Sequence, residues 1–178
     1  DENITSLMRL DQNRAKSILS NKLKKTVDSI SRLVVWGNHS ATQYPDLTNT
    51  LISGDDSLVK KIDMTWISEV FIPRVQKRGA EIIEHRGKSS AASAASAIYD
   101  HLNVLVNSSK DWESMGIMRS NDYGISNEIF FSYPLIIENS IISINNDLKL
   151  TDDSFKYIKE SEAELLTERN IIRSILKD

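Results

Sequence analysis

The residue best suited to proton transfer in this chain of 178 residues is His39, one of three histidines. It follows the apolar run ISRLVVW (30–36) and a Gly-Asn pair, a pattern typical of a buried strand that ends just before the histidine. A histidine, with a pKa of about 6.5, can accept or donate a proton at neutral pH if a carboxylate fixes its other ring nitrogen. Of the other two, we expect His85 to be solvated and His101 to serve packing.

Asp11 and Arg14 are the candidates for the partners of His39. They lie three residues apart in a segment with helical periodicity, so their side chains share one side of a helix. If that helix packs beside the end of strand 30–36, Asp11 can hold a ring nitrogen and Arg14 can present its planar guanidinium to a substrate carboxylate. The alternative is an ordinary surface salt bridge beside a structural histidine, and spacing alone favours it.

The elements that must position these residues follow from apolar periodicity and turn signals. One helix is predicted at 5–20 and onward toward Lys25, and a second at 64–86, with a defect near residue 72 because of Pro73. A third is predicted after Gly87 through a Ser/Ala-rich run, and a fourth from an N-cap at Thr151 almost to Asp178. Strands are predicted at 30–36, near 51–52, and at 113–118, 129–137 and 141–144, with a turn at Asn121-Asp122. Long helices with a mostly antiparallel sheet indicate an α+β fold.

Composition excludes several classes of function. The chain has a net charge of −3, 40% hydrophobic residues and no cysteine, which argues against a nucleic-acid partner, a disulfide framework and a thiolate metal site. No two histidines have metal-ligand spacing, so we expect no metal. No apolar run approaches the roughly 18 residues of a membrane span, and the acidic start is unlike a signal peptide, so we expect a cytoplasmic protein without a membrane partner.

Two segments together resemble the catalytic-domain signatures of cytosolic-type malate dehydrogenases. They are MRLDQNRA (8–15) and VVWGNHSATQYPD (34–46). The segment VQKRGAEIIEHRGKSSAASAASAIYDH (75–101) is similar to the family's Gln-Arg-Gly helix with its Ser/Ala-rich continuation, and SMGI with YGISNEIFFSYP (123–134) is similar to its late strands. The resemblance covers essentially the whole chain. The WGNHS sequence at the histidine differs from those of lactate dehydrogenases and of mitochondrial-type malate dehydrogenases.

The resemblance implies a role for each candidate residue. His39 would be the proton acceptor and donor, Asp11 its carboxylate partner, and Arg14 the clamp on the carboxylate beside the reacting carbon. Ser93 resembles the family serine that approaches the nicotinamide and the substrate. Nearby serines compete with it for this role: Ser89, Ser90 and Ser96.

The resemblance also implies a domain organisation. Residues 1–178 would be the C-terminal substrate-binding and catalytic domain, of the kind found in the lactate/malate dehydrogenase fold. NAD would be bound mainly by an N-terminal Rossmann half, since no G-x-G-x-x-G fingerprint occurs among the six glycines. We expect oxidation of malate to oxaloacetate by a homodimer, and an isolated segment without activity.

Two other functions compete with this interpretation. The chain could be a dimerising scaffold that keeps the fold without catalysis, although a scaffold has no physical need for Asp11, Arg14 and His39 together. A hydrolase that uses a serine near residue 90 is weaker, because no G-x-S-x-G elbow is present.

Overall fold

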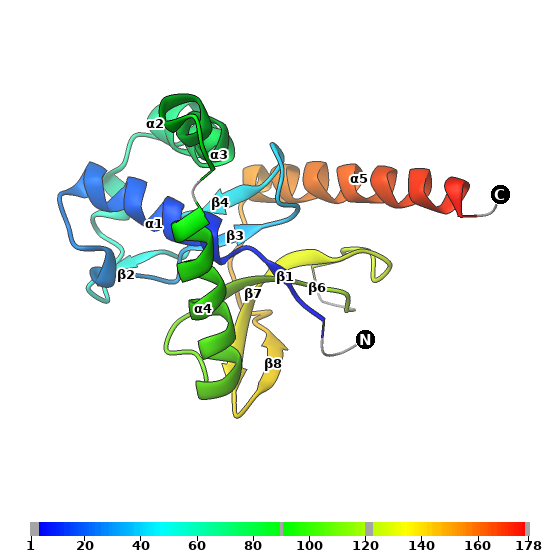
Figure 1. Cartoon of the computed structure of the whole chain (residues 1–178). Helices are drawn as coiled ribbons and strands as arrows, with labels where there is room; N and C mark the ends of the chain where they lie inside the picture. Colours follow the sequence, from blue (N-terminus) through cyan, green and yellow to red (C-terminus); the bar gives the residue numbers. More distant parts are fainter. Residues whose placement is uncertain (1–3, 90, 120–122, 177–178) are drawn as a thin grey trace.

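The computed structural model describes residues 4–89, 91–119 and 123–176, and it confirms the α+β fold (Figure 1). A four-stranded antiparallel sheet has the order β1-β6-β7-β8, with strands Ser6–Leu7, Glu113–Ile117, Phe131–Glu138 and Ile141–Ile144. Two small antiparallel pairs lie beside it: β2 (Ile30–Ser31) with β5 (Leu51–Ile52), and β3 (Val34–Trp36) with β4 (Tyr44–Asp46).

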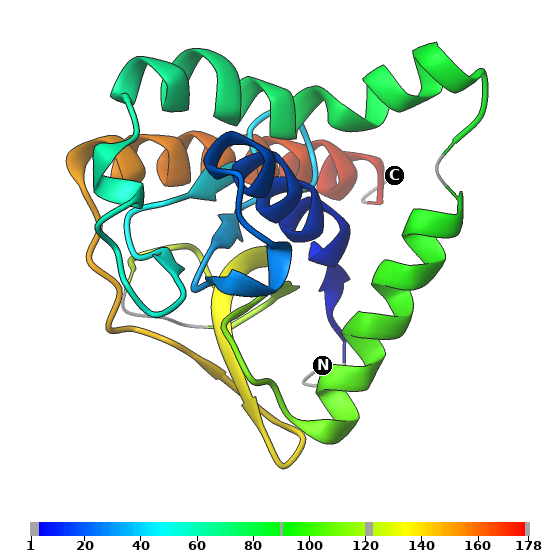
Figure 2. The ribbon, with the colours of Figure 1, turned by 90° about the vertical axis from the view of Figure 1, so that its left-hand side faces the viewer.

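Runs of helices alternate with runs of strands along the chain. The helices are α1 (Arg9–Leu23), α2 (Met64–Trp66), the π-helical turn η3 (Ile67–Phe71), α3 (Ile72–Arg86), α4 (Ala91–Asn107) and α5 (Asp152–Ile175), with short 3₁₀ turns η1 (Val27–Ser29) and η2 (Val59–Lys61). Figure 2 shows α1 at the centre, with α3 across one side and α4 descending along another. None of the described helices is both long and apolar enough to cross a bilayer.

The core lies where α1, β3 and the four-stranded sheet meet. All three residues of β3 are buried, and Trp36 packs edge-on against Tyr123 and Tyr133. Burial of this aromatic cluster fixes β3 against β7, so the loop that follows β3 begins from a rigid point.

The first predicted helix begins four residues later than expected. Ser6 and Leu7 form β1 instead, paired with Gly116 and Met115 of β6. A Cβ atom at Gly116 would lie 1.9 Å from the Ser6 hydroxyl oxygen, so the glycine makes room for this strand. Backbone pairing at a sheet edge therefore overrides the helical periodicity of residues 5–8.

The predicted strand 30–36 is two strands that belong to different sheets. Arg32 has a φ of +58°, which turns the chain between β2 and β3. Periodicity cannot show this break, because a left-handed residue in the middle of an apolar run leaves the pattern unchanged.

The helix predicted at 64–86 has its defect where proline requires one. The π-helical turn ends at Phe71, and Pro73 then occupies the first turn of α3, where its missing N–H costs no helical hydrogen bond. The Ser/Ala-rich run forms α4 as predicted, and the three late strands agree within two residues. Thr151 caps α5 as predicted, accepting a hydrogen bond from the Ser154 amide at 3.1 Å. The turn predicted at Asn121-Asp122 lies outside the described residues.

Candidate active site

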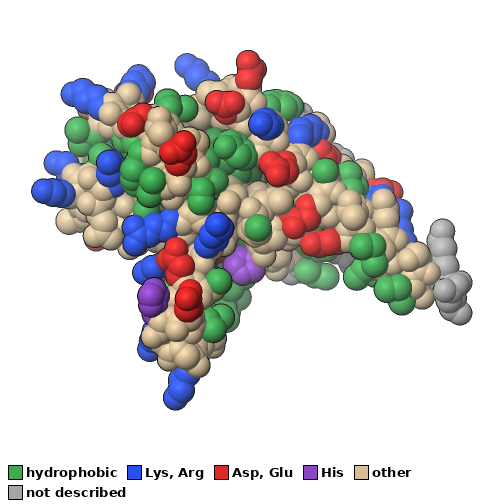
Figure 3. Space-filling view, turned by 90° about the horizontal axis from the view of Figure 1, so that it is seen from above, with side chains coloured by type: hydrophobic (Ala, Val, Ile, Leu, Met, Phe, Trp, Pro, Cys, Tyr) green, Lys and Arg blue, Asp and Glu red, His purple; other side chains and the backbone are tan. Residues whose placement is uncertain are grey.

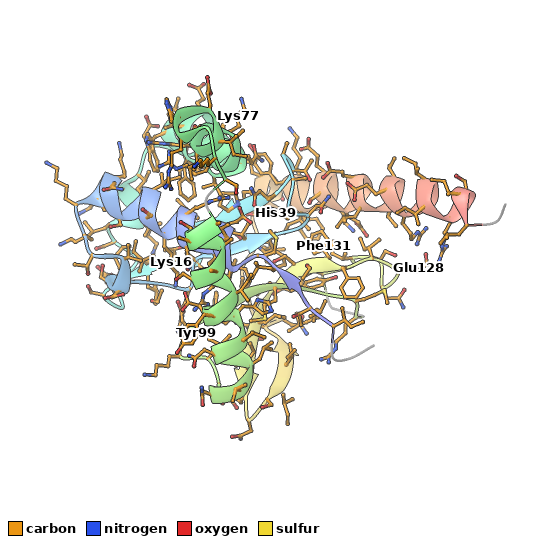
Figure 4. All side chains as sticks on the ribbon, viewed as in Figure 1. Lys16, His39, Lys77, Tyr99, Glu128 and Phe131 are labelled. Atoms are coloured by element: carbon orange, nitrogen blue, oxygen red, sulfur yellow. The ribbon has the colours of Figure 1, made fainter. Side chains whose placement is uncertain are left out.

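His39 lies in the loop between β3 and β4, two residues after a glycine that the fold requires. Gly37 has a φ of +92°, and its N–H and carbonyl both hydrogen bond to the Ser132 backbone at 3.1 Å. The Asn38 amide then donates to the Ser161 hydroxyl of α5 at 2.8 Å. These bonds fix the backbone of Gly37 against β7 and that of Asn38 against α5, just before His39. Figure 4 shows the histidine between α3 and the four-stranded sheet.

Asp11 reaches His39 from the first turn of α1. Its Oδ2 atom lies 2.6 Å from Nδ1 of His39, and its Oδ1 atom accepts a hydrogen bond from Arg14 at 3.2 Å. The Asp11 side chain is fully buried, whereas 59% of the His39 side chain is exposed. The buried Asp11 carboxylate therefore contacts one side of a histidine whose other side is exposed to solvent. The structure brings His39, Asp11 and Arg14 together, as expected from the sequence.

Gln12, which the sequence analysis did not single out, fixes the start of α1. Its buried amide donates to the carbonyls of Leu33 at 2.9 Å and Trp112 at 2.8 Å, and its Oε1 atom accepts from the Ser114 amide at 3.2 Å. A fully satisfied buried amide locks the helix in register with its neighbours. The only sign of this role in the sequence is that the glutamine stands next to the candidate Asp11.

The contact with Asp11 raises the pKa of His39 above its ordinary value. The hydrogen bond between the two side chains is the largest cause, and the negative charge of Asp11 acts in the same direction. Burial and the positive charge of Arg14 oppose it. The geometry therefore favours a protonated imidazole that can donate from its other ring nitrogen.

A cavity of about 280 Å³ adjoins these three residues. Its lining includes Asp11, Arg14, His39, Ser40, Gln43, Gln76, Gly79 and Ser89. The Gln76 amide donates to the Gln43 carbonyl at 2.9 Å, which ties α3 to the loop that carries His39. Gly79 of α3 lies against the Arg14 guanidinium, and a Cβ atom there would sit 3.7 Å from it, in ordinary contact.

The serines of the Ser/Ala-rich segment divide between two cavities. Ser89 lines the cavity of His39, whereas Ser93 and Ser96 line a neighbouring cavity of about 630 Å³ between α1, α3 and α4. Arg14 borders both cavities, so the two are adjacent. Ser90 lies outside the described residues.

The charge around the site is mixed. Figure 3 shows acidic and basic side chains interspersed over the face that carries α3 and α5. Within the described parts of the chain, no three histidine, aspartate or glutamate side chains gather as a metal ion would need. The chemistry that the site supports is proton exchange beside a bound anion.

Comparison with known proteins places this geometry in a family. The model of the lactate/malate dehydrogenase alpha/beta C-terminal domain matches residues 8–174. The chain belongs to the lactate/malate dehydrogenase family. The fold expected from the sequence is thereby confirmed, as is membership of the lactate/malate dehydrogenase family, whose members are NAD-dependent oxidoreductases.

Solved structures of lactate/malate dehydrogenases agree with the match. The malate dehydrogenase of Naegleria fowleri is 40% identical over 97% of this chain and 53% of its own, with a TM-score of 0.91. The lactate dehydrogenase of Trichomonas vaginalis, in complex with NADH and oxamate, is 30% identical over 99% of this chain and 56% of its own, with a TM-score of 0.93. The chain spans about half the length of the structures that it matches.

Proposed function

We propose that residues 1–178 are the C-terminal substrate-binding and catalytic domain of a malate dehydrogenase of the cytosolic type. In this proposal the enzyme interconverts (S)-malate and oxaloacetate in the cytoplasm, as a homodimer. The observation that carries the proposal is the convergence of His39, buried Asp11 and Arg14 on one cavity.

The proposed roles are those that the resemblance implies, and the geometry supports them. Because Nδ1 of His39 faces Asp11, Nε2 is the nitrogen that exchanges a proton with the oxygen on C2 of the substrate. In malate oxidation His39 accepts the hydroxyl proton, and in oxaloacetate reduction the protonated ring returns it. Arg14 binds the carboxylate next to C2 with a planar pair of donors and so orients the reacting carbon.

NAD, when bound, supplies the hydride acceptor. The residues of this chain fit only the edge of such a site: they contain no G-x-G-x-x-G fingerprint. Ser93 is exposed on the first turn of α4 and is our proposed contact to the nicotinamide, with Ser89 as its competitor. We therefore assign most of the dinucleotide site to an N-terminal half.

Malate is favoured over lactate by two observations. The sequence at the histidine, Trp-Gly-Asn-His-Ser, resembles that of cytosolic malate dehydrogenases. Identity is also higher to the Naegleria malate dehydrogenase than to the Trichomonas lactate dehydrogenase, at 40% against 30%. The residues that would bind the distal carboxylate of malate lie, in this proposal, in the N-terminal half.

The test is a fusion enzyme in which this chain replaces the matched part of the Naegleria enzyme. We expect NADH-dependent reduction of oxaloacetate by the fusion, because this chain then supplies His39, Asp11 and Arg14 to the joined active site. His39→Gln should lose about 10²–10⁴-fold in kcat, the usual contribution of a positioned acid-base group. Turnover by the isolated 178 residues, or a fusion without NADH-dependent reduction of oxaloacetate, would contradict the proposal.

A further inference from the structure

The loop that carries His39 is tied to α5 chiefly through the carboxylate of Glu164, while Glu168 accepts one further hydrogen bond from the Asn38 side-chain amide at 3.2 Å. The Oε2 atom of Glu164 accepts hydrogen bonds from the Ser40 hydroxyl at 2.5 Å, from the Thr42 hydroxyl, and from the Asn38 side-chain amide at 3.3 Å. The donors come from both sides of His39 in the sequence. Figure 1 shows the loop between β3 and β4 extending alongside α5.

Ser161, one turn earlier on α5, completes the anchor. Its buried hydroxyl accepts from the Asn38 amide at 2.8 Å and is hydrogen bonded to the Thr42 hydroxyl at 3.0 Å. A Cβ atom at Gly37 would lie 2.1 Å from the Ser161 oxygen, which shows how closely the loop approaches the helix. The loop is thus fitted to this stretch of α5 by shape as well as by hydrogen bonds.

The position of the imidazole depends on this anchor. More than half of the His39 side chain is exposed, so packing restrains it weakly, and Asp11 fixes one ring nitrogen only. The ring stays in line with Asp11 only while the backbone from Asn38 to Thr42 keeps its place. Glu164 is half-buried, and although burial opposes ionisation, the hydrogen bonds from the loop lower its pKa, so it remains a charged acceptor at neutral pH.

We propose that Glu164 is a positioning residue, which holds the Asn38–Thr42 loop so that the His39 ring stays aligned with Asp11 and the cavity. Its effect on catalysis rests on the proposed function of His39. Its effect on the geometry of His39 does not, because the loop, Asp11 and Glu164 all belong to this chain.

The first experiment therefore uses the 178-residue chain alone and measures the pKa of His39 by NMR titration. Glu164→Ala should lower this pKa toward about 6.5, because the ring loses its alignment with Asp11. Glu164→Gln should lower it less, since the amide oxygen still accepts from the two hydroxyls. Glu160→Ala, which removes an exposed carboxylate one turn earlier on the same helix, should leave it unchanged.

Equal shifts for Glu164→Ala and Glu164→Gln would mean that Glu164 acts by charge alone, and an unchanged pKa in Glu164→Ala would mean that it does not hold the ring. Either result overturns the proposal. If Glu164→Ala fails to fold, Ser40→Ala replaces it, because this variant removes one anchoring bond while the Glu164 charge remains. A lowered His39 pKa in Ser40→Ala supports positioning, and an unchanged one contradicts it.

The second experiment measures kinetics in the fusion enzyme. A catalytic base displaced by about 1 Å costs up to about 10²-fold in rate. Glu164→Ala should accordingly lower kcat for oxaloacetate about ten- to a hundredfold, with the KM for NADH within about twofold, and Glu164→Gln should restore part of the rate. A rise in KM with an unchanged kcat would contradict positioning. If the unsubstituted fusion is inactive, the proposed function fails, yet the NMR titration still decides the role of Glu164.

Discussion

Asp11, which is fully buried on α1, supports His39, which is exposed in the loop after β3, through a contact of 2.6 Å between Oδ2 and Nδ1. The pair places a buried carboxylate next to an exposed imidazole. It therefore sets both which ring nitrogen faces the cavity and how strongly that ring holds its proton.

Replacing Asp11 by Asn should lower the pKa of His39. The hydrogen bond to the carboxylate and its charge raise this pKa, and burial and Arg14 then remain to lower it. We expect a value below the ordinary one of about 6.5, measured by NMR titration of the ring. In the fusion enzyme the high-pH side of the pH-rate profile for oxaloacetate reduction, which needs the protonated ring, should move to lower pH with it. Asp111→Asn is a suitable control, since this aspartate pairs with Lys16 away from the cavity.

Protonation of His39 should contribute to the stability of the fold. Because its pKa is raised in the folded state, the contribution is fully present below the unfolded pKa of about 6.5 and is lost as the pH rises through the folded pKa. The difference in free energy of unfolding between the wild type and His39→Gln should therefore shrink as the pH rises above about 6.5. Urea denaturation at several pH values measures it. A difference that grows with pH would show that the shift has the opposite sign.

Replacing Arg14 by Gln should weaken substrate binding by the fusion enzyme. A charge-assisted hydrogen bond contributes about 1.5–3 kcal/mol, so the KM for oxaloacetate should rise about 10- to 150-fold. Arg14→Lys should recover little, because a lysine lacks the planar pair of donors. Arg78→Gln is the matched control: it lines the neighbouring cavity only and pairs with Glu81. Equal effects of the two substitutions would argue against Arg14 as a specific clamp.

The two candidate serines can be separated by which ligand each affects. We expect Ser93→Ala to raise the KM for NADH and Ser89→Ala to raise the KM for oxaloacetate, since only Ser89 lines the cavity of His39. Loss of one neutral hydrogen bond corresponds to about 2- to 13-fold. If Ser89→Ala changes the KM for NADH instead, the role that the resemblance gives to Ser93 belongs to Ser89.

Substitution of Gly37 by Ala should destabilise the fold more than the same change at Gly54. Both glycines have positive φ, +92° and +84°, so the conformational cost of about 1 kcal/mol is shared. Only at Gly37 does the new Cβ atom overlap Ser161, at 2.1 Å from its oxygen, whereas nothing lies within 4 Å at Gly54. Thermal unfolding of both variants checks the order, and Gly37→Ala with Ser161→Gly should recover part of the difference.

Much of the fold could be predicted from local patterns. The Ser/Ala-rich helix, the late strands and the cap at Thr151 are encoded by neighbouring residues, whose spacing and turn chemistry act within a few positions. The predicted helix start was wrong because Ser6 pairs with Gly116, a partner more than a hundred residues away. Propensity within a segment carries no information about such a partner.

The sequence by itself determined which side chains can do the chemistry, because residue type sets the pKa range, the donors and the acceptors of His39, Asp11 and Arg14. Only the tertiary structure decided how they act. Packing buries Asp11, and it brings together segments that are 21 to 126 residues apart. Examples are the hydrogen bond from Gln12 to the Leu33 carbonyl and the hydrogen bond from Asn38 to Glu164. Contacts of that range arise from packing of the whole chain, so no local pattern encodes them.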